Sequence, residues 1–131
     1  SASGSKTALL LHLLRSEGGG DGSCSNGSKA RHVQGVVVAN DADFGRCRKM
    51  RLRLAPMRSP GLLLTCHLAQ AFPGESGSFD RVLCDVPCSG DGTMRKNPTV
   101  WDKWRPAQSR CMHALQLSIL ERGLALVRVG G

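Results

Sequence analysis

The sequence has 131 residues, of which 40% are hydrophobic and 21% are charged, so it corresponds to one modest globular domain and not to a disordered chain. Lys and Arg number 18 against 10 Asp and Glu, and the net charge of +8 favours association with a polyanion such as a nucleic acid. From composition alone, the same charges are equally compatible with a solvated surface. No apolar run approaches the roughly 20 residues that cross a bilayer, so we expect no membrane partner.

The six cysteines are spread along the chain, and no export signal is visible, so we expect reduced thiols and not a disulfide framework. They are Cys24, Cys47, Cys66, Cys84, Cys88 and Cys111. A structural zinc site needs clustered pairs such as C-x-x-C, whereas the closest pair here is Cys84 and Cys88. We therefore expect no metal.

The N-terminal part combines a small-residue turn with a helix and a loop. Residues 1–7 form the turn, which leads into an apolar helical pattern over residues 8–14. The first turn of such a helix offers backbone N–H groups to an anionic or polar ligand. Residues 16–32 are rich in Gly, Ser and Asn and lack an apolar period, which predicts a flexible loop.

Three short apolar runs, at residues 35–41, 61–67 and 79–85, are typical of strands buried on both faces of a parallel sheet. Helices are expected over residues 44–54 and 107–127, where apolar residues recur with helical spacing. This alternation predicts one α/β domain with a parallel sheet along the whole chain.

The expected strand ends carry the polar and reactive side chains. Asp41 ends the first strand, His67 the second and Asp85 the third. Ligands of open α/β sheets bind beyond the carboxyl ends of the strands. A carboxylate such as Asp41 can accept hydrogen bonds from both hydroxyls of a ribose, but an Asp at a strand end is also a common turn or cap residue. Both interpretations of Asp41 stay open at this point.

The loop after the third strand places the Asp85 carboxylate and the Cys88 thiol three residues apart. Pro87 stiffens the loop, and Gly90 and Gly92 keep it open. Such a loop can hold reactive groups in a fixed geometry. It can equally be a buried small-residue turn in which Cys88 is only a packing residue.

The next segment interleaves cations with the two tryptophans of the chain. Arg95, Lys96 and Lys103 can contact phosphates while Trp101 stacks on a base, which predicts a nucleic-acid-binding surface. Alternatively, Trp101 and Trp104 both pack this segment onto the core.

The chain resembles the Nop/Sun family of RNA cytosine-5 methyltransferases, and within it the eukaryotic tRNA-modifying branch. Three stretches carry the resemblance: residues 2–7 (ASGSKT), residues 38–43 (VANDAD) and, most specifically, residues 83–97 (LCDVPCSGDGTMRKN). The family has the class I methyltransferase, Rossmann-like, doubly wound sheet and takes its methyl group from S-adenosylmethionine. The resemblance therefore implies this α/β fold, this cofactor, an RNA substrate that is expected to be tRNA, and an intracellular site in the nucleus or nucleolus.

The resemblance also implies roles for single residues. Asp41 matches the acid that holds the cofactor ribose, Asp85 the carboxylate near the methyl donor and target base, and Cys88 the thiol that assists release of the methylated product. The loop that wraps the methionine part of the cofactor matches Ser1, Ala2, Ser3, Gly4, Ser5 and Lys6.

Three positions depart from the family pattern. Ser3 stands where the family usually has Pro, which loosens the turn, and Leu68 stands where an acid faces the adenine, which is expected to weaken cofactor binding. The family's nucleophilic cysteine lies in a Thr-Cys-Ser motif that would follow Gly131. We therefore expect an internal fragment that lacks the first strand and the nucleophile-bearing strand, folds poorly alone and does not catalyse methylation.

Two other functions are compatible with the same residues. A noncatalytic RNA-binding remnant would use the basic surface without needing a cofactor, and its RNA binding would be sensitive to salt. A phosphate-binding P-loop is suggested by residues 4–7 (GSKT), although Ser5 occupies the position of the second glycine in G-x-x-x-x-G-K-[ST].

Overall fold

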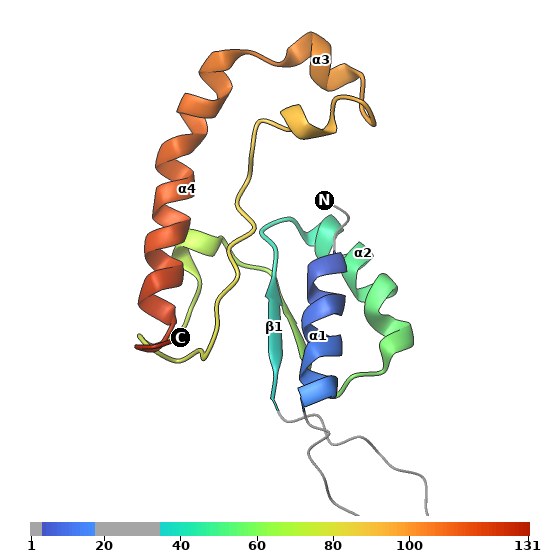
Figure 1. The fold of residues 1–131 in the computed structure, drawn as a ribbon, viewed down its shortest axis with the longest axis vertical. Coiled ribbons are helices and arrows are strands. Elements are labelled where there is room, and N and C mark those ends of the chain that lie inside the picture. Colours follow the sequence, from blue (N-terminus) through green and yellow to red (C-terminus); the bar gives the residue numbers. More distant parts are fainter. Residues whose placement is uncertain (1–3, 18–34) are drawn as a thin grey trace, which may run out of the picture. The chain divides into compact units, whose positions relative to one another are not determined.

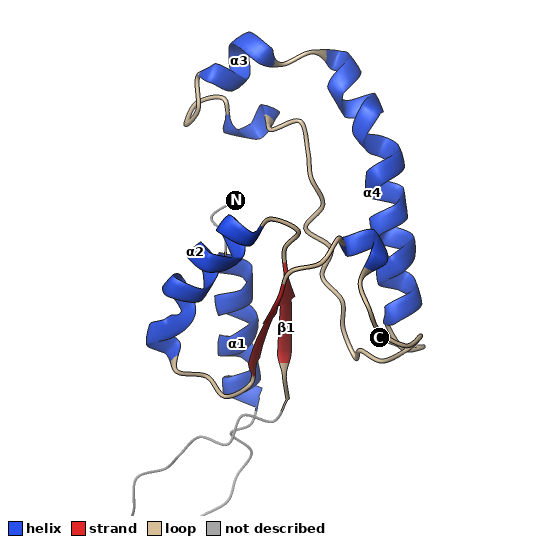
Figure 2. Cartoon of the chain, turned by 180° about the vertical axis from the view of Figure 1, so that it is seen from behind, coloured by secondary structure: helices blue, strands red, loops and turns tan. Residues whose placement is uncertain are grey.

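The computed structural model of the protein describes residues 4–17 and 35–131 (Figures 1 and 2). Ser1, Ala2 and Ser3 of the expected cofactor loop lie outside the described residues. The chain divides into two compact units, Ser1–Leu68 and Ala69–Gly131, and each is described by itself.

The first unit is built on a two-stranded parallel sheet. Strand β1 (Val37–Asn40) pairs with β2 (Leu62–Thr65), and helices α1 (Ser5–Glu17) and α2 (Phe44–Leu54) pack against these strands (Figure 1). Parallel strands require a crossover connection, which α2 supplies. The two strands predicted over residues 35–41 and 61–67 are confirmed but are shorter at both ends.

Helix α2 has the bounds that its apolar spacing predicted. Its first turn is capped by Asp43, whose side chain accepts the backbone N–H of Arg46 at 2.6 Å. Cys47, Met50 and Leu54 form the buried face of the helix. Because these positions follow the helical period, they turn the same side toward the sheet.

A small apolar core holds the first unit together. Ala39 of β1 packs with Met50 and Leu54 of α2, and Leu54 is only 2% exposed. Partly buried residues that surround this cluster are Ala8, Met57, Leu62 and Leu64. Val37 of β1 pairs with Leu62 of β2, and this register determines which side chains of the two strands face the core.

Two connections differ from the predicted ones. Helix α1 continues to Glu17, past the expected start of the loop over residues 16–32, and residues 18–32 of that loop lie outside the described residues. After α2, a short 3-10 helix η1 (Ala55–Met57) leads to Arg58, whose φ of 43° puts a side-chain-bearing residue in the left-handed region.

The second unit is dominated by helix α4 (Pro106–Leu126), close to the predicted bounds of 107–127. Shorter helical segments precede it: η2 (Ala69–Ala71), η3 (Asp91–Thr93) and α3 (Thr99–Lys103). Arg122 of α4 donates hydrogen bonds to the carbonyls of Phe72, at 2.9 and 2.6 Å, and Gly74, at 2.8 Å. These contacts fasten the start of the unit to its long helix.

The third predicted strand, over residues 79–85, is not formed. Phe79 makes one parallel bridge to Val127, and residues 80–85 carry no ladder. A strand needs a second strand to pair with, and among the described residues this segment has only the one bridge to Val127. The apolar run predicted burial, whereas Leu83 is 58% exposed.

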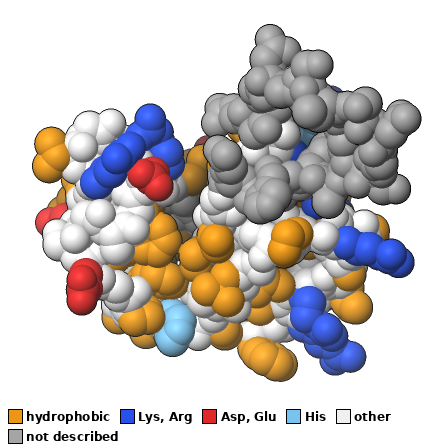
Figure 3. All heavy atoms as spheres, turned by 90° about the horizontal axis from the view of Figure 1, so that it is seen from below, with side chains coloured by type: hydrophobic (Ala, Val, Ile, Leu, Met, Phe, Trp, Pro, Cys, Tyr) orange, Lys and Arg blue, Asp and Glu red, His pale blue; other side chains and the backbone are white. Residues whose placement is uncertain are grey.

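The surface retains many large apolar side chains among its polar ones, as the lower face shows (Figure 3). They include Val36 just before β1, Leu63 within β2, and Leu117 and Leu124 on α4. Within the described ranges, we find no helix with the length and apolarity that crossing a membrane requires.

Replacement of the core residue Leu54 tests this packing. We expect Leu54→Ala to lower the free energy of unfolding by about 2–5 kcal/mol, because it removes buried methyl groups and leaves a cavity beside Ala39 and Met50. Leu52→Ala is the matched control on the same helix, since Leu52 is 60% exposed and should change stability by less than about 0.5 kcal/mol. Urea unfolding measures both, and equal effects would contradict the assigned core.

Candidate functional site

The Asp41 carboxylate lies directly after β1, at the carboxyl end of the sheet. Its Oδ1 accepts the backbone N–H of Asp43 at 2.9 Å and forms an ion pair with Nη2 of Arg46, also at 2.9 Å. The Asp41 side chain is 22% exposed. Oδ2 accepts no hydrogen bond from the described residues, so one oxygen is fixed while the other remains available to a ligand. Asp41 is therefore both a turn residue and a candidate acceptor.

The side chain of Asn40 joins the two strand ends. Its Nδ2 donates to the carbonyl of His67 at 2.9 Å, and its Oδ1 accepts the His67 N–H at 2.9 Å and the Thr65 hydroxyl at 3.0 Å. These bonds continue the pairing beyond the sheet and hold the position of Asp41. From the sequence, no role of its own was assigned to Asn40, and the amide at the strand end was the available signal.

The Cys47 thiol lies beneath this edge. Its Sγ donates to the carbonyls of Asp41, at 3.2 Å, and Thr65, at 3.4 Å, and so links α2 to both strand ends. Burial raises the pKa of the Cys47 thiol, and the neighbouring Cys66 thiol and the Asp41 charge raise it further. Cys47 is thus a protonated hydrogen-bond donor at neutral pH, a role that its place on the apolar face did not reveal.

Gly4 positions the N-terminus of α1 in the same unit. Its φ of +95° favours glycine, and a Cβ there would lie 3.2 Å from Cγ of Met50, so the Met50 side chain would have to shift slightly. Ser5 and Lys6 then begin the helix, whose first turn contains no acidic residue. The N-terminal end of a helix carries a partial positive charge that suits an anionic group.

The Asp85–Cys88 loop belongs to the second unit, and both side chains are exposed there. The carbonyl of Pro87 accepts a hydrogen bond from Nε2 of Gln116 in α4 at 2.8 Å. This hydrogen bond attaches the loop to α4, which is distant from it in sequence. The interpretation of Cys88 as a buried packing residue is therefore wrong for this structure.

The turn after Cys88 is closed by short polar contacts. Gly90 adopts a φ of 76°, the left-handed conformation that glycine permits. The Thr93 hydroxyl donates to the Gly90 carbonyl at 2.6 Å, and the Ser89 hydroxyl donates to the Asp91 carboxylate at 2.8 Å. Gly92 does not take a positive φ, so of these two glycines only Gly90 needs the left-handed conformation.

The two tryptophans that follow this turn have different environments. Trp101 of α3 is 72% exposed, whereas Trp104 is half-buried. Arg95, Lys96 and Lys103 are exposed in the same unit. The expectation that both indoles pack onto the core is therefore wrong for Trp101, which is available for stacking.

The predicted site residues fall into two groups. Gly4 and Asp41 are in the first unit with Ser5 and Lys6, and Asp85 and Cys88 are in the second with the basic segment. Across the described parts of the chain, no three His, Cys, Asp or Glu side chains gather as metal ligands do.

Comparisons with known proteins agree with these motifs. Residues 1–131 match the family described as "16S rRNA methyltransferase RsmB/F". The tRNA (cytosine(34)-C(5))-methyltransferase of Drosophila melanogaster is 40% identical, over 99% of this chain and 18% of its own length. The multisite-specific tRNA:(cytosine-C(5))-methyltransferase of Saccharomyces cerevisiae is 42% identical, over 99% of this chain and 19% of its own.

A solved structure has a similar fold. The crystal structure of PH0851 superposes with a TM-score of 0.67 and 28% sequence identity, and the match covers 72% of this chain and 22% of that one. The chain therefore belongs to the RsmB/F family of methyltransferases and has part of the Rossmann-like fold that was predicted. It spans about a fifth of the length of the curated relatives it matches.

The raised pKa of Cys47 predicts its reactivity. Because the thiolate is the reactive form, we expect iodoacetamide to label Cys47 more slowly than the exposed Cys111 between pH 7 and about pH 9. As the pH rises past 9.0, the ordinary pKa of a cysteine thiol, Cys47 loses its proton in the unfolded chain before it does in the folded chain. The stability that protonated Cys47 contributes should therefore be lost above that pH. Peptide mapping by mass spectrometry measures the rates, and equal labelling would contradict this environment.

Proposed function

We propose that this chain supplies the cofactor-binding and RNA-binding part of an RNA cytosine-5 methyltransferase that acts on tRNA. The observation that carries the proposal is the Asp41 carboxylate, held by one oxygen at the carboxyl end of β1 with the other oxygen open. The names of the relatives from Drosophila and yeast support tRNA as the substrate class.

The first unit fits S-adenosylmethionine as its ligand. Oδ2 of Asp41 can accept hydrogen bonds from ribose hydroxyls, and the residues that begin α1 provide a polar, positively polarised end for the carboxylate of the methionine part. Leu68, which is 57% exposed, offers apolar contact but no acceptor for an adenine amino group. When bound, S-adenosylmethionine supplies an electrophilic methyl group.

The second unit supplies groups for the target base. Carbon 5 of cytosine is a weak nucleophile until a thiolate adds to carbon 6. After carbon 5 has gained the methyl group, loss of its proton restores the double bond and expels the thiolate. Cys88 fits the thiol that assists this release, and Asp85 fits the carboxylate beside the base.

The thiolate that adds to carbon 6 comes from elsewhere in the proposed enzyme. The family places this cysteine in a Thr-Cys-Ser motif, which residues 1–131 do not contain. Cys88 therefore keeps the role of product release in the proposal and is not assigned as the nucleophile. The RNA contacts are assigned to Arg95, Lys96, Trp101 and Lys103, which are exposed in the second unit.

A noncatalytic RNA-binding remnant is the second candidate, favoured by the net charge of +8. The two candidates differ in their need for a cofactor. Isothermal titration with S-adenosylmethionine separates them, because the remnant binds RNA without binding the cofactor. Methyl transfer from labelled S-adenosylmethionine to tRNA is the second measurement, made on the full-length protein.

The open oxygen of Asp41 predicts the effect of its replacement. We expect Asp41→Asn to weaken binding of S-adenosylmethionine by about 1–1.5 kcal/mol, since a hydrogen bond to a charged acceptor is replaced by a weaker one to a neutral amide. Asp80→Asn is the charge-matched control, because Asp80 is exposed and pairs with Arg128 in the second unit. Equal affinity of the two variants for the cofactor would overturn the assignment.

The role of Cys88 predicts a trapped intermediate. In the full-length protein, we expect Cys88→Ala to accumulate a covalent complex with tRNA, because addition to carbon 6 still occurs while release is slowed. The complex is measured as a slowly migrating band on a denaturing gel. Cys111→Ala, which removes another exposed thiol, should release product normally. Normal turnover by Cys88→Ala would show that release does not depend on this thiol.

A further inference from the structure

Two neighbouring hollows lie between α2 and β2 of the first unit. One, of about 440 Å³, is lined by residues from Arg51 to Leu64 at the η1 end, and the other, of about 470 Å³, lies toward Phe44 and Cys66. Arg51 and Leu64 line both hollows, so together they form one groove along this edge. We call it the α2–β2 groove. At its second end it reaches Thr65 and Cys66, beside the strand ends that hold Asp41.

The rim of the groove is cationic. Arg48, Arg51 and Arg58 line it, and all three side chains are exposed. The surrounding segment, residues 44–68, contains six Lys and Arg residues and no Asp or Glu. Arg48 and Arg51 share a helix face because they are three residues apart. This arrangement is complementary to a row of phosphates.

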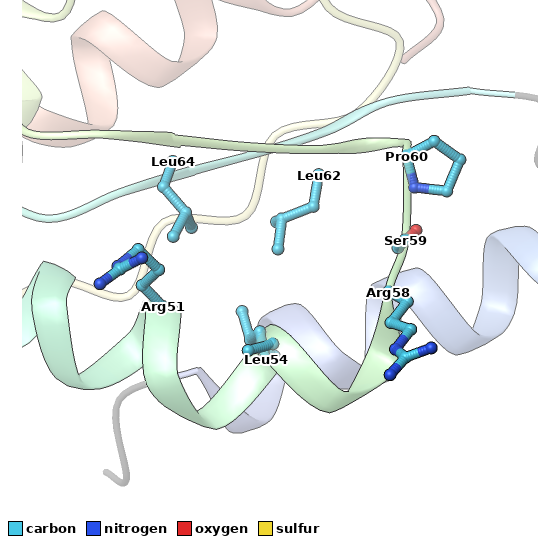
Figure 4. A pocket seen from close by; sticks show the side chains of 8 residues that line it. Arg51, Leu54, Arg58, Ser59, Pro60, Leu62 and Leu64 are labelled. Carbon is cyan, nitrogen blue, oxygen red and sulfur yellow. The ribbon is translucent and has the colours of Figure 1, made fainter.

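The floor of the groove is apolar. Leu54 of α2 faces Leu62 and Leu64 of β2, with Arg51 and Arg58 on either side (Figure 4). At the other end, Phe44 is 76% exposed and lines the second hollow. An exposed aromatic ring beside cations is the arrangement that stacks on bases of single-stranded nucleic acid while the phosphates are neutralised.

We propose that the α2–β2 groove binds a single-stranded segment of the RNA substrate, with Arg48, Arg51 and Arg58 on its phosphates and Phe44 stacked on a base. The inference rests on the proposed function in taking RNA as the substrate. It adds a second contact surface, on the first unit, to the basic segment of the second unit. One end of the groove lies beside the Asp41 edge. RNA bound in the groove would therefore lie next to the proposed cofactor site.

Ser59 supplies an independent indication of a ligand. Its Oγ is buried at the lining of the first hollow and has no hydrogen-bond partner among the described residues. A buried hydroxyl without a partner is unfavourable, and a rotation about its Cα–Cβ bond would let it donate to a phosphate or a base. A filled groove thus satisfies a group that the empty groove leaves unsatisfied.

The salt dependence of RNA binding tests the arginine contacts. A fluorescent oligocytidine RNA of about twelve nucleotides is the probe, and anisotropy gives its dissociation constant over a series of salt concentrations. For a single strand, each lost phosphate contact reduces the magnitude of the negative slope of log K against log salt by about 0.7. The double variant Arg51→Gln/Arg58→Gln loses two contacts and should reduce that magnitude by about 1.4. Arg81→Gln/Arg110→Gln removes the same charge from exposed sites outside the groove and should leave the slope unchanged.

Two further variants distinguish a nucleotide groove from a general polyanion surface. Phe44→Leu keeps an apolar side chain but removes the ring, and should weaken binding of the oligocytidine by about fivefold or more, with no effect on binding of polyglutamate. Ser59→Ala should weaken RNA binding severalfold without lowering the thermal unfolding temperature. If Phe44→Leu binds the RNA as tightly as the wild type, no base stacks there and the inference is overturned.

The outcomes also separate this inference from the proposed function. If the wild-type protein binds neither RNA nor S-adenosylmethionine, the proposed function fails. If it binds both, but the Arg51/Arg58 and Arg81/Arg110 variants have the same salt slope, only the α2–β2 groove is wrong. Retained cofactor affinity in the Arg51/Arg58 variant confirms that its loss of RNA binding is local.

Discussion

The hydrogen bonds of Asn40 are the constraint on which the first unit depends. Each strand has only four residues, and a two-stranded sheet is marginally stable without further support. The Asn40 amide extends the pairing to Thr65 and His67 with three more bonds. Asp41 follows directly in the chain, so the same bonds that lengthen the sheet also orient the carboxylate. Asn40 therefore gives structural support, and the adjacent Asp41 makes the proposed ligand contact.

The two acids that follow β1, Asp41 and Asp43, both have defined partners. Asp41 pairs with Arg46, and Asp43 caps α2, while residues 44–68 contain no Asp or Glu of their own. Arg46 is thus engaged by Asp41, while Arg51 and Arg58 line the α2–β2 groove. A single helix serves both surfaces because successive arginines lie on different sides of it.

The sequence predicted α2 well because its signals are local: the cap, the apolar period and the proline after it all lie within a few residues of one another. Residues 79–85 show the opposite case, since an apolar run indicates a strand but cannot specify the neighbour that a strand needs. Asp41 was found from its position at a strand end. The roles of Asn40 and Cys47 depend on contacts with Thr65, which lies distant in sequence, and no local pattern contains them.

The division of the site between two units has a mechanistic consequence. Asp41 is held by contacts within the first unit, whereas the Asp85–Cys88 loop is held by Gln116 of the second. The proposed cofactor contact and the proposed base-side groups can therefore be tested by substitutions in different units. In the proposed enzyme, the bound RNA carries the target base. An RNA segment in the α2–β2 groove would then contribute to catalysis through the binding energy that places the target base.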